Sequence, residues 1–116
     1  MIIVFKIFIS NAFSLQMVDI KAHNMIETFK LSIDDVKGLC RNHEVISCIG
    51  HADLANVVSS ILETEIKPNR ISINLNVSDM LVVAQLTGGR LPEGTTKLPE
   101  GFNIEFVCVR LVTSIK

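Results

Sequence analysis

The stretch IGHAD, residues 49–53, and the apolar run that follows it decide how this chain is organised. Apolar residues recur after Asp53 at helical spacing, which predicts a helix from His51 to about Glu63. Gly50 interrupts the chain just before this helix, and Asp53 suits its first turn. His51 is therefore expected at a helix N-terminus, where free backbone N–H groups and the helix dipole attract phosphate. Such a histidine is either a candidate general acid or a helix-start residue satisfied by the backbone.

Length and composition indicate one globular domain. The chain has 116 residues, 48% of them hydrophobic and 20% charged, so a single α/β domain over residues 1–116 is expected. The formal net charge of −1 disfavours a protein that coats duplex DNA, so any binding of duplex DNA should be weak. The apolar segment Met1–Phe13 is interrupted by Lys6 and Asn11, is too short to span a membrane, and lacks the basic start of a signal peptide. We therefore expect an intracellular protein that has reduced cysteines and no membrane partner.

Five runs of β-branched, aromatic or alternating apolar residues predict strands. They cover residues 2–9, 27–33, 70–77, 80–86 and 102–112. A turn at Ser78-Asp79 would join the third and fourth runs into a hairpin. Ser32 or Asp34 can cap a short helix that ends near Cys40, whereas the apolar piece 45–49 fits no element clearly. The predicted fold is a two-layer α/β domain, with a mixed sheet of about five strands flanked by helices.

The residues around this helix start also allow two other interpretations, a zinc site and a catalytic nucleophile. Cys40, His43, Cys48 and His51 have the form C-x2-H-x4-C-x2-H, in which each half has the spacing of a metal knuckle. The interior of four residues is shorter than in zinc ribbons or fingers, so we expect no metal and no cofactor. Cys48 close to His51, or Ser14, could instead supply a nucleophile, but no elbow motif surrounds Ser14.

Several polar residues are expected at strand ends and in loops. Asn11 and Ser14 follow the first predicted strand, Arg70 begins the third, and Arg90 lies in the glycine-rich loop 88–94. Ligands bind preferentially at such places in α/β proteins. Each residue also has an ordinary interpretation, as a turn residue that satisfies the backbone or as a solvated arginine. Spacing alone does not place them on one edge of the sheet.

Four fragments, in this order along the chain, resemble segments of the DUF1874 family of small viral proteins. They are Ser10-Asn11-Ala12-Phe13-Ser14, Ile49-Gly50-His51, Pro68-Asn69-Arg70 and Gly89-Arg90-Leu91-Pro92-Glu93-Gly94. This family comprises the type III anti-CRISPR ring nucleases of archaeal viruses and some bacterial elements. The resemblance implies a homodimer in the host cytoplasm. Its ligand pocket would lie across the two-fold axis, bind cyclic tetra-adenylate and cleave it without metal.

The resemblance also implies roles for individual residues. By position, His51 resembles the catalytic histidine of the family, and Arg90 and Glu93 match its active-site arginine and glutamate. The other matches are ligand-contacting positions: Asn11, Ser14 and Arg70. In this chemistry a ribose 2′-hydroxyl attacks the adjacent phosphorus, and His51 protonates the leaving 5′-oxygen. The alternative function is a dimeric viral protein that binds nucleic acid without cleaving it.

Overall fold

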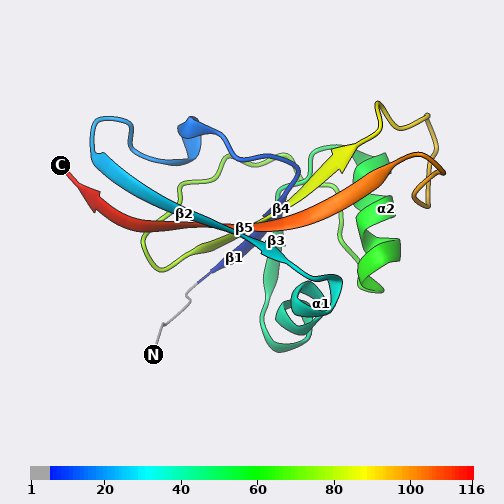
Figure 1. Ribbon diagram of the computed structural model, residues 1–116, viewed down its shortest axis with the longest axis horizontal. Coiled ribbons are helices and arrows are strands. Elements are labelled where there is room, and N and C mark those ends of the chain that lie inside the picture. The colour runs from blue at the N-terminus through cyan, green and yellow to red at the C-terminus, as the bar shows by residue number, and fades with distance from the viewer. Residues whose placement is uncertain (1–5) are drawn as a thin grey trace.

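The computed structural model describes residues 6–116 of the chain. These residues form a five-stranded sheet, two α-helices and a short 3-10 helix (Figure 1). The elements, in chain order, are β1 (Ile7–Ser10), η1 (Leu15–Met17), β2 (His23–Leu31), α1 (Ile33–Asn42), β3 (Val45–Ser47), α2 (Ala52–Leu62), β4 (Met80–Thr87) and β5 (Asn103–Ile115). Among residues 6–116, neither α-helix has the length and apolar character needed to cross a bilayer.

The sheet is mixed, as predicted. Its strand order is β2-β5-β4-β1-β3. β1 runs parallel to both of its neighbours, β3 and β4, whereas β5 is antiparallel to β4 and β2. α2 lies toward one end of the long axis and α1 lies nearer the middle, and the β2–β5 ribbon extends toward the other end (Figure 1). The expected mixed α/β sheet of about five strands with helices is therefore confirmed.

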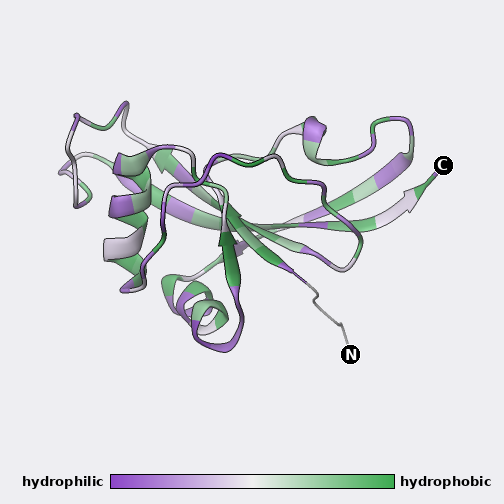
Figure 2. Cartoon of the chain, turned by 180° about the vertical axis from the view of Figure 1, so that it is seen from behind, coloured by the Kyte–Doolittle hydropathy of each residue, from purple (hydrophilic) through white to green (hydrophobic). Residues whose placement is uncertain are grey.

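The central strands β1 and β4 are buried on both faces of the sheet, whereas most of β2 is exposed. Successive side chains of a strand point to opposite faces, so Ile7 and Ile9 join the core beneath the helices, and Phe8 joins a second core. The helix-side core includes Val57, Val58 and Leu62 of α2. The second core is covered by irregular chain around residues 13–18 and 73–75 instead of by a helix. Hydrophobic residues accordingly dominate the central strands (Figure 2).

Both helices begin close to where the sequence predicts. Ser32 caps α1: its hydroxyl accepts from the Asp35 N–H at 3.0 Å, and the Asp35 carboxylate accepts from the Ser32 N–H at 3.0 Å. This backbone N–H and then the Ser32 hydroxyl lower the pKa of Asp35. α1 continues to Asn42, two residues beyond the predicted end at Cys40. The predicted helix from His51 to about Glu63 is α2, with these two residues as its N-cap and C-cap.

The strand predicted over Arg70–Val77 is wrong. Ile73 and Leu75 pack into the second core, as the alternation implied, but Ile71 is 45% exposed. The segment has no strand partner, because both edges of β4 are already paired, with β1 and β5. It crosses the sheet face instead, where the Leu75 N–H donates to the carbonyl of Met17 in η1 at 2.7 Å. The predicted hairpin with residues 80–86 is therefore absent.

Other strand boundaries also shift. β2 begins at His23 and ends at Leu31, because Ser32 already caps α1 and Ile33 lies in that helix. The predicted strand over residues 2–9 is β1 from Ile7 to Ser10, and its residues 2–5 lie outside the described part of the chain. The unassigned piece 45–49 supplies β3, which pairs with β1 at the edge of the sheet.

Candidate functional site

Three parallel strands end at the same edge of the sheet. The chain leaves β1 toward the face covered by irregular segments, and it leaves β3 toward α2 on the opposite face. Open α/β sheets bind ligands at such a point, outside the carboxyl ends of strands whose connections diverge. Asn11 follows β1, His51 lies between β3 and α2, and Arg90 follows β4. The topology therefore brings together residues that are far apart in sequence.

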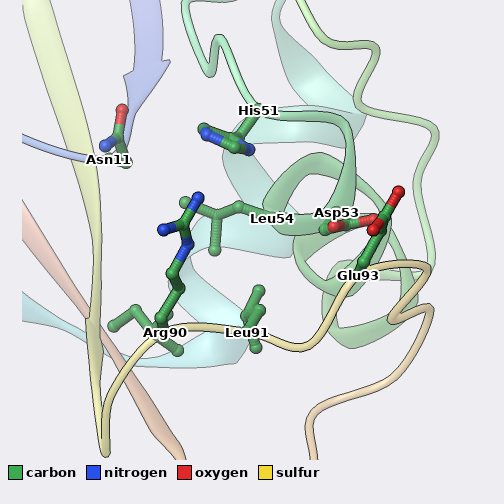
Figure 3. Close-up of a pocket in the computed structure, with 8 residues that line it drawn as sticks. Asn11, His51, Asp53, Leu54, Arg90, Leu91 and Glu93 are labelled. Carbon is green, nitrogen blue, oxygen red and sulfur yellow. The ribbon is translucent and has the colours of Figure 1, made fainter.

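A pocket of about 600 Å³ lies at this edge (Figure 3). It is lined by Asn11, His51, Asp53, Leu54, Leu86, Arg90, Leu91 and Glu93. Its volume is within the range of about 300–1,000 Å³ that is typical of small-molecule sites. Four of the six residues predicted for the site thus line one cavity: Asn11, His51, Arg90 and Glu93.

Buried backbone holds His51 in place. Ile49 is fully buried, and the Cys48 N–H donates to the carbonyl of Ile9 in β1 at 2.7 Å. The Asn69 N–H donates to the Ile49 carbonyl at 2.8 Å. His51 itself is the exposed N-cap of α2, and its side chain makes no capping hydrogen bond. The backbone at this residue is therefore fixed, while the imidazole is free to contact a ligand.

Arg90 lies on the loop between β4 and β5, and its guanidinium extends toward the space between Asn11 and His51 (Figure 3). Within residues 6–116, no carboxylate lies within ion-pairing distance of this guanidinium. The turn that carries Glu93 is held by the backbone N–H and the hydroxyl of Thr95, which both donate to the Pro92 carbonyl. The loop thus presents one cation to the pocket without an internal counter-ion.

Charge is unevenly distributed in the pocket. Asn11, His51 and the Arg90 guanidinium lie on one side, and the carboxylates of Asp53 and Glu93 lie on the other (Figure 3). Three leucines contribute the apolar lining. A guanidinium binds phosphate oxygens, and an imidazolium can also give a proton to an oxygen. The arrangement therefore suits a ligand that places a phosphate beside His51 and Arg90 and presents hydrogen-bond donors to Asp53 and Glu93.

Ser14 and Arg70 do not line this pocket. The Ser14 hydroxyl caps η1, because it accepts from the Gln16 N–H at 3.2 Å. The Arg70 Nε donates to the carbonyl of Gly50 at 3.3 Å. A Cβ at Gly50 would lie only 2.9 Å from the Arg70 Cγ. In this structure Ser14 is a local cap, and Arg70 supports the turn that precedes His51.

Sequence reasoning missed half of the lining residues. The sequence predicts Asp53 only as a first-turn residue of the helix, and it predicts Leu54, Leu86 and Leu91 only as parts of a helix, a strand and a loop. A usable signal for Asp53 is its position in the first turn of this helix, two residues after the candidate His51 at the N-cap. The leucines carry no such signal, because an apolar residue that lines a pocket has the same pattern as a core residue.

The zinc and nucleophile interpretations of the helix start are not supported. Cys40 packs against the helix-side core and Cys48 belongs to the second core, so the two thiols lie on opposite faces of the sheet. Within residues 6–116, no three His, Cys, Asp or Glu side chains gather closely enough to hold a metal ion. Burial raises the pKa of Cys48 to about 11, so its reactive thiolate form is scarce at neutral pH.

Comparisons with known proteins relate this chain to archaeal viruses. The model of a family described as STIV B116-like matches residues 7–104. "Uncharacterized protein 26" of Sulfolobus islandicus filamentous virus (isolate Iceland/Hveragerdi) is 37% identical over 70 residues, which make up 60% of this chain and 58% of that protein. The match thus spans less than two thirds of that curated relative. B116 of Sulfolobus turreted icosahedral virus superposes with a TM-score of 0.74 and 26% identity, over 90% of this chain and 98% of that one.

Proposed function

Because this chain belongs to the STIV B116-like family, and because its pocket gathers His51, Arg90 and Glu93, we propose that it is a viral ring nuclease. Its substrate is cyclic tetra-adenylate, and it acts without metal to give linear di-adenylate that ends in a 2′,3′-cyclic phosphate. Destruction of this messenger suppresses type III CRISPR signalling in the host cytoplasm. The observation that carries the proposal is the convergence of Arg90 and His51 at the carboxyl ends of three parallel strands; within residues 6–116, Arg90 has no ion pair and the His51 side chain makes no capping hydrogen bond.

Each pocket side chain has a task in this reaction. The ribose 2′-oxygen forms a bond to the adjacent phosphorus, its proton passes to water, and the bond from phosphorus to the 5′-oxygen breaks. His51 as imidazolium gives its proton to that leaving oxygen. Arg90 neutralises the charge that develops on the phosphorane oxygens, and the amide of Asn11 can donate to one of them. Glu93, three residues beyond Arg90, orients either the guanidinium or the imidazole.

The pocket volume favours a homodimer as the active species. About 600 Å³ suits one drug-sized ligand, roughly one or two nucleotides, and a ring of four nucleotides is much larger. A two-fold axis next to the pocket would double this space and present two copies of each reactive side chain. Two cuts at symmetric positions would convert one ring of four nucleotides into two identical dinucleotides, which agrees with the proposed product.

The charge of the protein supports a pocket enzyme over a protein that coats nucleic acid. The formal net charge is −1, and the pocket itself contains two carboxylates beside a single arginine. Coating of duplex DNA requires many phosphate contacts from clustered lysine and arginine. A small ring needs only a few well-placed donors, so the observed charges suit it better.

The test is to incubate the protein with cyclic tetra-adenylate in EDTA and to separate the products by chromatography and mass. We expect di-adenylate with a 2′,3′-cyclic phosphate. A ring of 2′-deoxyadenylate is the matched control, because it lacks the attacking hydroxyl and must remain intact. Absence of cleavage, cleavage of the deoxy ring, or activity that appears only after metal is added would contradict the proposal. Binding of duplex DNA that weakens steeply with salt, without cleavage of the ring, would favour the non-catalytic alternative.

A further inference from the structure

The pocket has three chemically different parts. The Arg90 guanidinium, with His51 and Asn11, forms its phosphate-binding side. Leu54, Leu86 and Leu91 provide apolar surface, and Leu54 and Leu91 lie between the two charged sides (Figure 3). The carboxylates of Asp53 and Glu93 form the far side. A nucleotide has the same three parts in the same order: a phosphate, a flat base with apolar faces, and the polar edge of that base.

Asp53 is the fixed member of the acidic side. It is the second residue of α2 and is half-buried, whereas Glu93 lies on an exposed loop. Within residues 6–116, the Asp53 carboxylate takes part in no hydrogen bond and no ion pair, so its acceptor positions are free for a ligand. An ionised carboxylate only accepts hydrogen bonds. Whatever binds there must therefore present a donor.

We propose that Asp53 accepts a hydrogen bond from the exocyclic amine of a bound adenine and thereby makes the pocket selective for amino-purines. This inference rests on the proposed function, since it assumes that the phosphate binds beside His51 and Arg90. The adenine lies over the leucines, and its amine projects away from the sugar toward Asp53. The reacting 2′-hydroxyl is a poorer candidate for this contact, because it must lie next to the phosphorus on the opposite side of the pocket.

Selectivity follows from the loss of this hydrogen bond. A base without the amine leaves the half-buried Asp53 carboxylate desolvated and unpaired, and a site built around a hydrogen bond rejects such an analogue strongly. Asn at the same position has nearly the same shape, but its amide both donates and accepts and carries no charge. It should therefore bind purines with and without the amine to similar extents.

The experiment measures binding of two uncleavable rings by calorimetry. One is the cyclic tetramer of 2′-deoxyadenylate. The other contains purine in place of adenine, so that a hydrogen replaces each amine. The wild-type protein should bind the adenine ring about tenfold or more tightly. Asp53→Asn should reduce this ratio to near one. Asp34→Asn is the matched control, because Asp34 occupies the same second position in α1 and lies outside the pocket.

Each outcome decides between the hypotheses. Equal binding of the two rings by the wild-type protein overturns the inference without any variant, as does a ratio that persists in Asp53→Asn. Failure of either ring to bind also overturns it. Cleavage of the ribose ring, measured separately, still determines whether the proposed function stands. A ratio that falls equally in Asp34→Asn would assign the effect to helix stability and would likewise contradict a contact with the base.

Discussion

Replacement of His51 by alanine separates a catalytic histidine from a structural one. The side chain is exposed and makes no capping hydrogen bond, so His51→Ala should change the free energy of unfolding by less than about 0.5 kcal/mol. Loss of a general acid lowers the rate about 10²–10⁴-fold. At about 1.36 kcal/mol per factor of ten, that is about 3–5 kcal/mol of transition-state stabilisation. The effect on the rate should therefore exceed the effect on stability several-fold.

The assay combines urea unfolding with single-turnover cleavage of cyclic tetra-adenylate. The affinity for the ring should stay close to that of the wild type, because Arg90 and Asn11 still line the pocket. His43→Ala is the control: His43 is also exposed, but it is the C-cap of α1 and lies outside the pocket. A folded His51→Ala protein that cleaves the ring within a few-fold of the wild-type rate would refute the reasoning, and another group would have to protonate the leaving oxygen.

Four further outcomes are expected. Light scattering should give the mass of a dimer with and without ligand, and a monomer under both conditions would contradict the shared pocket. Ser32→Ala should lower the free energy of unfolding by about 1 kcal/mol, because it removes the α1 cap, and a urea midpoint equal to that of the wild type would refute the role of this cap. Burial raises the pKa of Cys48 and Cys108 to about 11, so these thiols stay protonated in the fold while the unfolded chain ionises them. Stability should therefore fall as the pH rises from about 9 to about 11, and urea titrations should show a smaller fall when both thiols are replaced by alanine. Gly88→Ala should lower the melting temperature more than Gly89→Ala, because both glycines have positive φ but only a Cβ at Gly88 would lie 2.6 Å from a backbone oxygen; equal losses would contradict this steric explanation.

The sequence by itself determined the elements whose signals are local. The 3.6-residue spacing of apolar residues and the Gly50 break predicted α2, with His51 at its start, and the structure confirms both. The Ser32 cap is read from a few neighbouring residues in the same way. Alternation over residues 80–86 and 102–112 predicted two strands, which are β4 and β5 with slightly different bounds. These elements depend on neighbours in the chain, so a linear pattern contains the necessary information.

Only the tertiary structure decided which segments become neighbours. Residues 70–77 alternate like a strand, but both edges of β4 are occupied, so they cover a sheet face instead. The unassigned piece at Val45 becomes an edge strand because β1 offers it a free parallel edge. Asp53 shares a pocket with Glu93 only because α2 and the β4–β5 loop meet at the same end of the sheet. An alternating pattern predicts which side chains are buried, but it does not predict what they pack against. The partner of a strand and the neighbours of a pocket residue are set by contacts between residues that are distant in sequence.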